Sequence, residues 1–218
     1  MFQKLRKKIR KSGKIDFSGI FFYALTLLRK DIKILLFNRI INFSCYIKGV
    51  KLGKNVIFNG KPIIRRYPNS SIIIGNDCKF NSAKYSIGIG LNEPCAFVTI
   101  GEGAEIVFGK NSGASGLKIA AKSKITIGNN VLLGSGCIIL DNDAHHSNPT
   151  KREQNIIPSR PIIIEDNVFV GIQCVILKGV TIGKNSVIGA RSLVINDIPE
   201  NSIAIGNPCK VIMKKNLI

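Results

Sequence analysis

Both histidines of this 218-residue chain, His145 and His146, lie side by side in the stretch LDNDAHHSNP, residues 140–149. Histidine titrates near neutral pH and is the usual side chain for moving protons or holding metals. Asp141 and Asp143 precede the pair, and a carboxylate that accepts a hydrogen bond from one ring nitrogen fixes the tautomer of the imidazole. The stretch therefore indicates proton transfer or metal binding, and these residues alone leave the choice between the two open. The sequence leaves open which aspartate orients the ring, and either one could instead cap a turn of the loop.

A period of six residues marks the last third of the chain. The residues at this spacing are apolar and β-branched: Ile164, Val170, Ile176, Ile182, Ile188 and Val194. Glycine follows several of them, as at Gly171 and Gly189, which predicts tight or left-handed backbone at corners. A period of six fits neither an amphipathic helix nor a hairpin array, but it fits short strands wound into a three-faced solenoid. We expect the apolar residues to stack inward, with Cys78, Cys137 and Cys174 as small inward residues.

The repeat is interrupted after Ile139 and resumes only at Ile164. The residues between, about 141–160, are polar and include two prolines, so they must leave the coil as an extruded loop. Both histidines lie on this loop. A histidine that served only the core would lie within a repeat instead.

The repeat pattern resembles the hexapeptide-repeat acyltransferases. The words VTIGKNSVIGARSLVINDIP (residues 180–199) and IAIGNPCKVI (residues 203–212) are similar to that family's last coils and exit segment, and the similarity covers about residues 70–212. It is strongest with the branch that acetylates sugars and bacterial surface polysaccharides. The resemblance implies a mainly β fold, the left-handed parallel β-helix, with a short α-helical N-terminal segment.

Three segments are expected on this basis. Residues 1–48 form a basic helical segment, residues 49–205 form the β-helix with its loop, and residues 206–218 form the exit segment. The word DNDAH resembles the segment that carries the family's catalytic histidine. This implies that His145 is the general base and that His146 is its neighbour.

The resemblance also implies an acetyl-CoA site and direct transfer of acetyl to a carbohydrate hydroxyl, without a metal. Backbone N–H groups near Gly171 and Ile172 are the implied donors to the tetrahedral oxyanion. Phe169 replaces a tryptophan that is common in the family and keeps an apolar wall. Lys210 matches the position whose cation meets the nucleotide phosphates. The implied donor-site residues are Phe169, Gly171, Ile172, Gly189, Ala190, Arg191, Lys210 and Lys214.

The family's active sites lie between neighbouring β-helices, which implies a homotrimer with C3 symmetry. Three other functions are compatible with a solenoid of this kind. A zinc hydratase needs three histidines per metal, and the chain has two. N-acetylation of an amino sugar or an antibiotic would use the same base, and a non-catalytic membrane-associated solenoid would use the loop only for binding; both stay open.

The positive charge is concentrated at the N-terminus. Residues 1–66 hold 17 Lys and Arg against two acidic residues, a net +15 of the total +19. This asymmetry predicts an anionic partner, and an anionic membrane surface is favoured. Nucleic acid is not expected, because no known reader motif or interleaved stacking aromatics accompany the basic residues.

Residues 1–48 alternate basic clusters with apolar groups and predict two short helices broken near Lys30 to Lys33. The apolar run FSGIFFYALTLL has only 12 residues and ends in LRKDIK, which fits neither a bilayer span nor a cleaved signal peptide. We therefore expect a cytoplasmic protein whose N-terminus lies on the inner face of the plasma membrane. Helices that cap the open end of the solenoid are the alternative.

Overall fold

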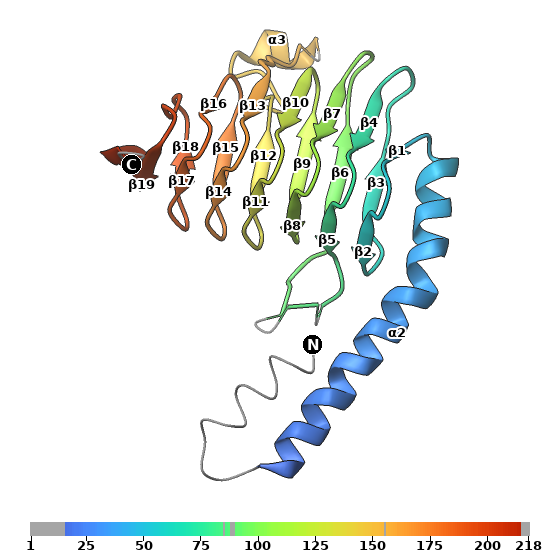
Figure 1. Cartoon of the computed structure of the whole chain (residues 1–218). Helices are drawn as coiled ribbons and strands as arrows, with labels where there is room; N and C mark the ends of the chain where they lie inside the picture. Colours follow the sequence, from blue (N-terminus) through green and yellow to red (C-terminus); the bar gives the residue numbers. More distant parts are fainter. Residues whose placement is uncertain (1–15, 85, 88–89, 155, 215–218) are drawn as a thin grey trace.

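A computed structural model describes residues 16–84, 86–87, 90–154 and 156–214. The described strands form three parallel sheets around one core, with a long helix at the N-terminal end (Figure 1). Sheet A contains β1 (Lys51–Leu52), β4 (Ser71–Ile74), β7 (Glu105–Phe108), β10 (Lys124–Ile127), β13 (Ile162–Ile164) and β16 (Thr181–Ile182). Sheet B contains β2 (Ile57–Asn59), β5 (Lys79–Asn81), β8 (Gly113–Ser115), β11 (Leu132–Leu133), β14 (Phe169–Val170), β17 (Val187–Ile188), β19 (Ser202–Ile205) and the antiparallel β20 (Lys210–Lys214). Sheet C contains β3 (Ile63–Arg65), β6 (Ala96–Thr99), β9 (Lys118–Ala121), β12 (Ile138–Leu140), β15 (Val175–Leu177) and β18 (Leu193–Val194).

The chain visits the sheets in the order A, B, C, so each coil has three corners. We call the turn from sheet A to sheet B the first corner, that from B to C the second, and that from C to A the third. The arrangement is the left-handed β-helix. The predicted inward stack is confirmed, because the six residues at hexad spacing from Ile164 to Val194 are all buried, and so are Cys78, Cys137 and Cys174.

The first corner is built by asparagines in left-handed backbone. Asn130, Asn167 and Asn185 have φ values of 55°, 59° and 61°. Each side-chain amide donates to the next carbonyl along the helix axis, with Nδ2–Oδ1 distances of 3.0 Å from Asn130 to Asn167 and 3.1 Å from Asn167 to Asn185. Asn and Asp tolerate this backbone better than other residues with side chains. The ladder therefore holds the coils in register at this corner.

The glycines after the inward residues have a different role from the one predicted. Gly171 and Gly189 are absent from the residues with positive φ, so the expected left-handed role is wrong for them. A Cβ added to Gly171 would lie 2.5 Å from the backbone nitrogen of Ala190. These glycines are needed because neighbouring coils approach closely at the second corner.

Phenylalanines replace the β-branched residues inside the N-terminal coils. Phe80 packs against Phe58, Phe97 and Phe108, with ring centroids 5.4, 5.0 and 5.3 Å away. All four rings are buried. The aromatic core explains why the sequence repeat is irregular here although the coils continue.

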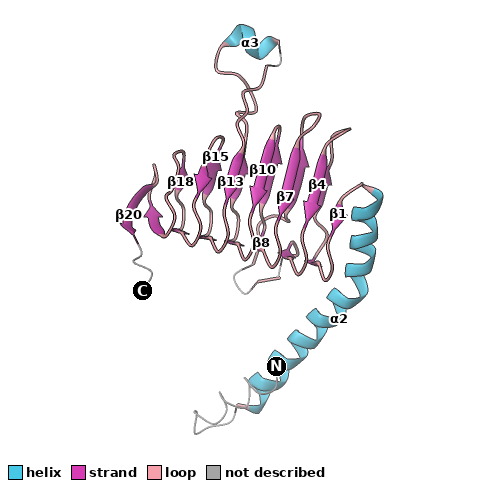
Figure 2. Ribbon diagram, turned by 45° about the horizontal axis from the view of Figure 1, so that its top comes forward, coloured by secondary structure: helices cyan, strands magenta, loops and turns pink. Residues whose placement is uncertain are grey.

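The N-terminal segment forms one helix, α2 (Phe17–Ile47), and the expected break near residues 30–33 is wrong. No Gly or Pro interrupts that stretch, and Lys and Arg are good helix formers. The C-terminal half of α2 covers the open end of the β-helix, where the Asn38 side chain accepts from Phe58 N–H at 2.8 Å and donates to the Val56 carbonyl at 3.0 Å. The N-terminal half extends away from the prism (Figures 1 and 2).

Among the described helices, none combines the length and apolarity needed to cross a membrane. The basic residues at positions 1–15 lie outside the described part of the chain. Capping thus accounts for the C-terminal half of α2, and among the described residues no strand or helix covers the apolar side chains of the N-terminal half.

Candidate active site

The loop at 141–160 leaves the third corner through a narrow neck, and the expected extrusion is confirmed. Asp143 N–H donates to the Pro158 carbonyl at 3.2 Å and Arg160 N–H donates to the Asp141 carbonyl at 2.9 Å. The neck leads to a short helix, α3 (Pro149–Glu153), whose N-cap is Asn148. Figure 2 shows α3 projecting beyond the edge of the prism. The neck fixes where the loop begins, so the histidines have a defined place.

Asp141 lies at the base of the neck and is completely buried. Its carboxylate accepts from the N–H groups of Lys122 and Ser123, both at 2.7 Å, and from the Ser123 hydroxyl at 3.0 Å. The Asn142 amide also donates to it at 3.0 Å. These contacts give Asp141 the turn-capping role, and it makes no hydrogen bond to either histidine ring.

His145 is exposed, and its ring makes no hydrogen bond to the described residues. The residue is held by its backbone, since its N–H donates to the Asp143 carbonyl at 2.6 Å. Ala144 before it has a φ of 59° and donates its N–H to the Asn142 side chain at 3.0 Å. The loop therefore fixes the His145 backbone and leaves the imidazole free to take a proton from a ligand.

His146 is engaged locally. Its Nδ1 accepts the Asn148 N–H at 3.0 Å, and its carbonyl accepts from the Arg152 guanidinium at 3.1 Å. These contacts tie the His146 ring into the turn that begins α3. Of the two histidines, His145 has the ring better placed for chemistry.

Asp143 forms an ion pair with Lys178, which follows β15 at the same corner one coil later. The two side chains are partly exposed. The pair positions the Asp143 carboxylate beside the loop, and Asp143 makes no hydrogen bond to the His145 ring here. Lys178 was not predicted from the sequence. The only signal for its proximity to Asp143 is its position directly after β15, the strand that pairs with β12 on the next coil.

The second corner gathers most of the residues predicted for the acyl donor. Gly171 and Ile172 follow β14, while Gly189, Ala190 and Arg191 follow β17 on the adjacent coil. The N–H of Gly171 donates to the Ile188 carbonyl at 2.8 Å, so it is occupied. The N–H of Ile172 donates to no described residue and remains available. Of the two backbone N–H groups expected as oxyanion donors, that of Gly171 is occupied and that of Ile172 is available.

The outer face of sheet B lies next to this corner. Phe169 is 44% exposed and pairs in register with Leu132, which is 55% exposed, so the two form an apolar wall. Lys210 is exposed on β20 at the C-terminal end of the same sheet. Lys214 ends that strand, and its side chain lies outside the described part. The sequence did not indicate Leu132, because an exposed leucine is recognised only once the neighbouring coil is stacked beside it.

A polar cavity of about 290 Å³ opens at the second corner beside Ile172. Ser135 and Gln173 line it, together with Asn92 and Glu93 from a chain excursion between β5 and β6. Glu93 forms an ion pair with Lys118 at 2.7 Å. Residues 90–93 were not predicted as part of a site, because they interrupt the repeat without a recognisable motif.

One chain does not bring His145 and the second corner together. His145 lies at the third corner, between β12 and β13, whereas Ile172 lies at the second corner, between β14 and β15. The two corners lie at opposite edges of sheet C, with strands such as β12 and β15 between them. A complete site therefore requires either a long reach of the loop or a second copy.

Comparisons with known proteins show which families and structures this chain resembles. Residues 161–196 match the family described as bacterial transferase hexapeptide (six repeats). Galactoside O-acetyltransferase from Lactococcus lactis subsp. lactis is 41% identical over 100 residues, covering 46% of this chain and 48% of the relative. Galactoside O-acetyltransferase from Escherichia coli K12 is 40% identical over 133 residues, covering 55% of this chain and 65% of the relative.

The chain thus spans about half to two thirds of the length of these curated relatives. A crystal structure of a maltose O-acetyltransferase from Clostridium difficile 630 matches with a TM-score of 0.52 and 26% identity. That match covers 88% of this chain and 89% of the other.

Proposed function

We propose that this chain, whose residues 161–196 match the hexapeptide transferase family and whose strands form a left-handed β-helix, transfers acetyl from acetyl-CoA to a hydroxyl of a carbohydrate. The observation that carries the proposal is the exposed His145 ring, free of hydrogen bonds to the described residues, on a loop whose neck is fixed. The similarity to galactoside and maltose O-acetyltransferases supports the class of acceptor. The reaction is an acyl transfer with His145 as general base.

The proposed chemistry needs no covalent enzyme intermediate. His145 removes the proton from the acceptor hydroxyl as the oxygen attacks the thioester carbonyl carbon. The Ile172 N–H donates to the oxyanion of the tetrahedral intermediate. The C–S bond then breaks, the ester remains on the sugar, and the imidazolium returns its proton to the thiolate of coenzyme A.

Asp143 is the preferred orienting acid, because the four hydrogen bonds to Asp141 commit that carboxylate to the coil beneath the loop. Lys178 positions the Asp143 side chain. Rotation of the exposed His145 ring toward Asp143 on substrate binding would fix its tautomer. Asp141 then acts as a positioning residue for the loop.

Acetyl-CoA is proposed to lie along the second corner. The pantetheine arm would lie beside Gly171, Gly189 and Ala190, whose lack of long side chains lets backbone amides approach it, and Phe169 provides an apolar wall. Arg191 and Lys210, with Lys214 as a further cation, would meet the phosphates at the C-terminal end. The proposed acyl transfer requires no metal.

A C3 homotrimer is proposed to complete the site, since a neighbouring copy can place its second corner against the His145 loop. Mixing two inactive variants tests this arrangement. His145→Ala lacks the base and Ile172→Pro lacks the amide donor, so each is expected to be inactive alone. Random mixed trimers should regain about a quarter of wild-type activity, because each shared site draws one half from each of two copies. No recovery, in trimers shown by light scattering to be mixed, would place the whole site within one chain.

We propose a surface polysaccharide of a bacterium, or its lipid-linked precursor, as the acceptor, with the protein attached to the cytoplasmic face of the membrane. The net +15 of residues 1–66 and the exposed apolar side chains of α2 support attachment. The protein should pellet with phosphatidylglycerol vesicles at low salt and be released at high salt. Absence from the vesicle pellet at low salt would remove the attachment.

The deciding experiment measures free thiol from acetyl-CoA with sugar and amino-sugar acceptors, for the wild type, His145→Ala and His146→Ala. We expect turnover with a hydroxyl acceptor that falls at least about 100-fold in His145→Ala, as for the loss of a general base. His146→Ala should retain most of the activity. Turnover with amines alone would favour N-acetylation, and no turnover with no acetyl-CoA binding would favour a non-catalytic solenoid.

A further inference from the structure

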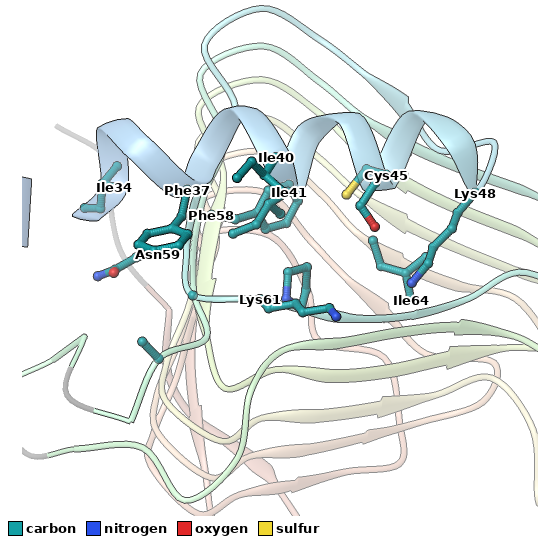
Figure 3. A pocket seen from close by; sticks show the side chains of 14 residues that line it. Ile34, Phe37, Ile40, Ile41, Cys45, Lys48, Phe58, Asn59, Lys61 and Ile64 are labelled. Carbon is teal, nitrogen blue, oxygen red and sulfur yellow. The ribbon is translucent and has the colours of Figure 1, made fainter. Parts of the chain in front are cut away.

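An apolar pocket of about 350 Å³ lies between α2 and the first coil, at the opposite end of the prism from the exit segment (Figure 3). Ile34, Phe37 and Ile41 line it from the helix, and Phe58, Pro62 and Ile64 line it from the coil. Its volume lies near the lower limit of small-molecule pockets, roughly 300–1,000 Å³.

The lining offers little to a polar ligand. Cys45 is buried in the wall, and that burial raises the pKa of its thiol to about 11, so the group stays neutral. The amide of Asn59 already donates to Asn81 at 3.4 Å. The interior of the pocket therefore suits a hydrocarbon chain.

Two lysines also line the pocket, Lys48 at the end of α2 and Lys61 before β3, and Figure 3 shows both side chains beside Ile64 and Ile41. Both lysines are exposed, and neither forms an ion pair with a described residue. The sequence from 48 to 66 contains six Lys and Arg and no acidic residue. An apolar interior with unpaired cations beside it matches the two ends of an anionic amphiphile.

The exposed side chains of α2 indicate where such a molecule would come from. Phe21, Phe22, Phe37, Ile40 and Phe43 are each more than half exposed. At about 100° per residue these five positions fall on one side of the helix, and exposed apolar side chains gathered in this way are typical of contact with protein or lipid. The pocket opens on this same helix.

We propose that the pocket binds one hydrocarbon chain of an anionic membrane lipid, with Lys48 and Lys61 meeting the phosphate of the headgroup. The lipid would seat α2 at a defined depth and fix the end of the β-helix against the bilayer. This site does not depend on acyl transfer, and its test involves no turnover.

The test uses the full-length chain and calorimetric titration with dihexanoyl phosphatidylglycerol below its micellar concentration. Dihexanoyl phosphatidylcholine and inorganic phosphate are the comparison ligands. We expect saturable binding of the glycerol lipid, about tenfold weaker binding of the choline lipid, and none of phosphate alone. Equal binding of both lipids, or binding of phosphate alone, would overturn the proposal.

Two variants locate the site. Ala83→Leu fills the pocket and should weaken binding at least about tenfold, the loss expected for displacing about two methylene groups. Lys48→Gln with Lys61→Gln should abolish the preference for the glycerol lipid. Lys51→Gln with Lys54→Gln removes the same charge from exposed positions that do not line the pocket and should preserve that preference.

Circular dichroism of each variant checks that it is folded. Unchanged binding in a folded Ala83→Leu variant would overturn the proposal. A change in its oligomeric state without a change in lipid binding would assign the pocket to a second copy of the chain instead.

Discussion

The first and third corners of the β-helix turn the chain by different means. At the first corner an Asn or Asp takes the left-handed backbone on successive coils, and side-chain amides link most of these residues into a ladder. At the third corner the residues in left-handed backbone are Asn69, Gly103, Ala144 and Gly179, which share no side-chain chemistry. A corner tied by a ladder cannot admit an insertion without breaking it. The loop that carries His145 leaves from the corner that has no ladder.

The largest effect on stability that this comparison predicts is at the base of the loop. Asp141→Ala removes a buried carboxylate and leaves the N–H groups of Lys122 and Ser123 without partners. We expect a loss of about 3 kcal/mol in the free energy of unfolding, because hydrogen bonds to charged groups are strong and unpaired buried groups are costly. Urea denaturation measures it.

Asp166→Ala is the matched control at the first corner. Asp166 also accepts from a backbone N–H one coil away, that of Asn129 at 2.7 Å, but it is exposed to water, which can replace the carboxylate. Its pKa is lowered by the hydrogen bonds from Asn129, so its smaller contribution should be present near neutral pH and lost as the pH falls below 3.8. If the two variants lost equal free energy of unfolding at pH 7, burial of Asp141 at the neck would not strengthen its contribution to stability.

The sequence predicted the C-terminal coils and the loop well, because the series of inward residues at steps of six from Ile164 to Val194 is β-branched throughout and the interruption after Ile139 is polar. It predicted the N-terminal coils less well, since Phe58 and Phe80 fill the same inward positions with a different side-chain shape. The asparagine ladder has a sequence signal, an Asn three residues after the inward residue of sheet A, as in Ile127 and Asn130 or Ile164 and Asn167. Its meaning becomes clear only when the coils are stacked.

The candidate site was predictable in its parts and not in its assembly. His145 could be found because the loop breaks the repeat. The sequence did not show that His145 and Ile172 lie at different corners, because that depends on how the repeats are divided among the three faces. The contacts of Asp141 and Asp143 are both long-range, to Ser123 and to Lys178, and spacing within the loop does not distinguish them. The continuous helix α2 was missed because a charged cluster interrupts the apolar pattern without interrupting the backbone.

A smaller effect is predicted within the ladder. Asn167→Ala loses the hydrogen bonds to Asn130 and Asn185 and places a β-carbon in left-handed backbone, which should cost about 1–2 kcal/mol. Asn167→Gly loses the same hydrogen bonds without the strain, so its stability should lie between that of Asn167→Ala and the wild type. Thermal unfolding of the three proteins separates the two contributions. If the glycine and alanine variants were equally unstable, the side-chain ladder rather than the backbone would hold this corner.

The smallest effect on stability is expected from Ala144→Gly at the third corner. Unlike the other variants, it should raise the free energy of unfolding. Ala144 natively has the strained φ of 59°, next to His145, where the first corner uses asparagine. Removing its β-carbon should raise the free energy of unfolding by up to about 1 kcal/mol, reduced by the greater entropy of glycine in the unfolded chain. The same change should loosen the link between the neck and His145, so the acetyl-CoA turnover number should fall although the fold is no less stable. A variant that is more stable and fully active would show that the strain at Ala144 does not serve to position His145. A variant that is more stable and slower would show that this corner maintains strain to hold the base in place.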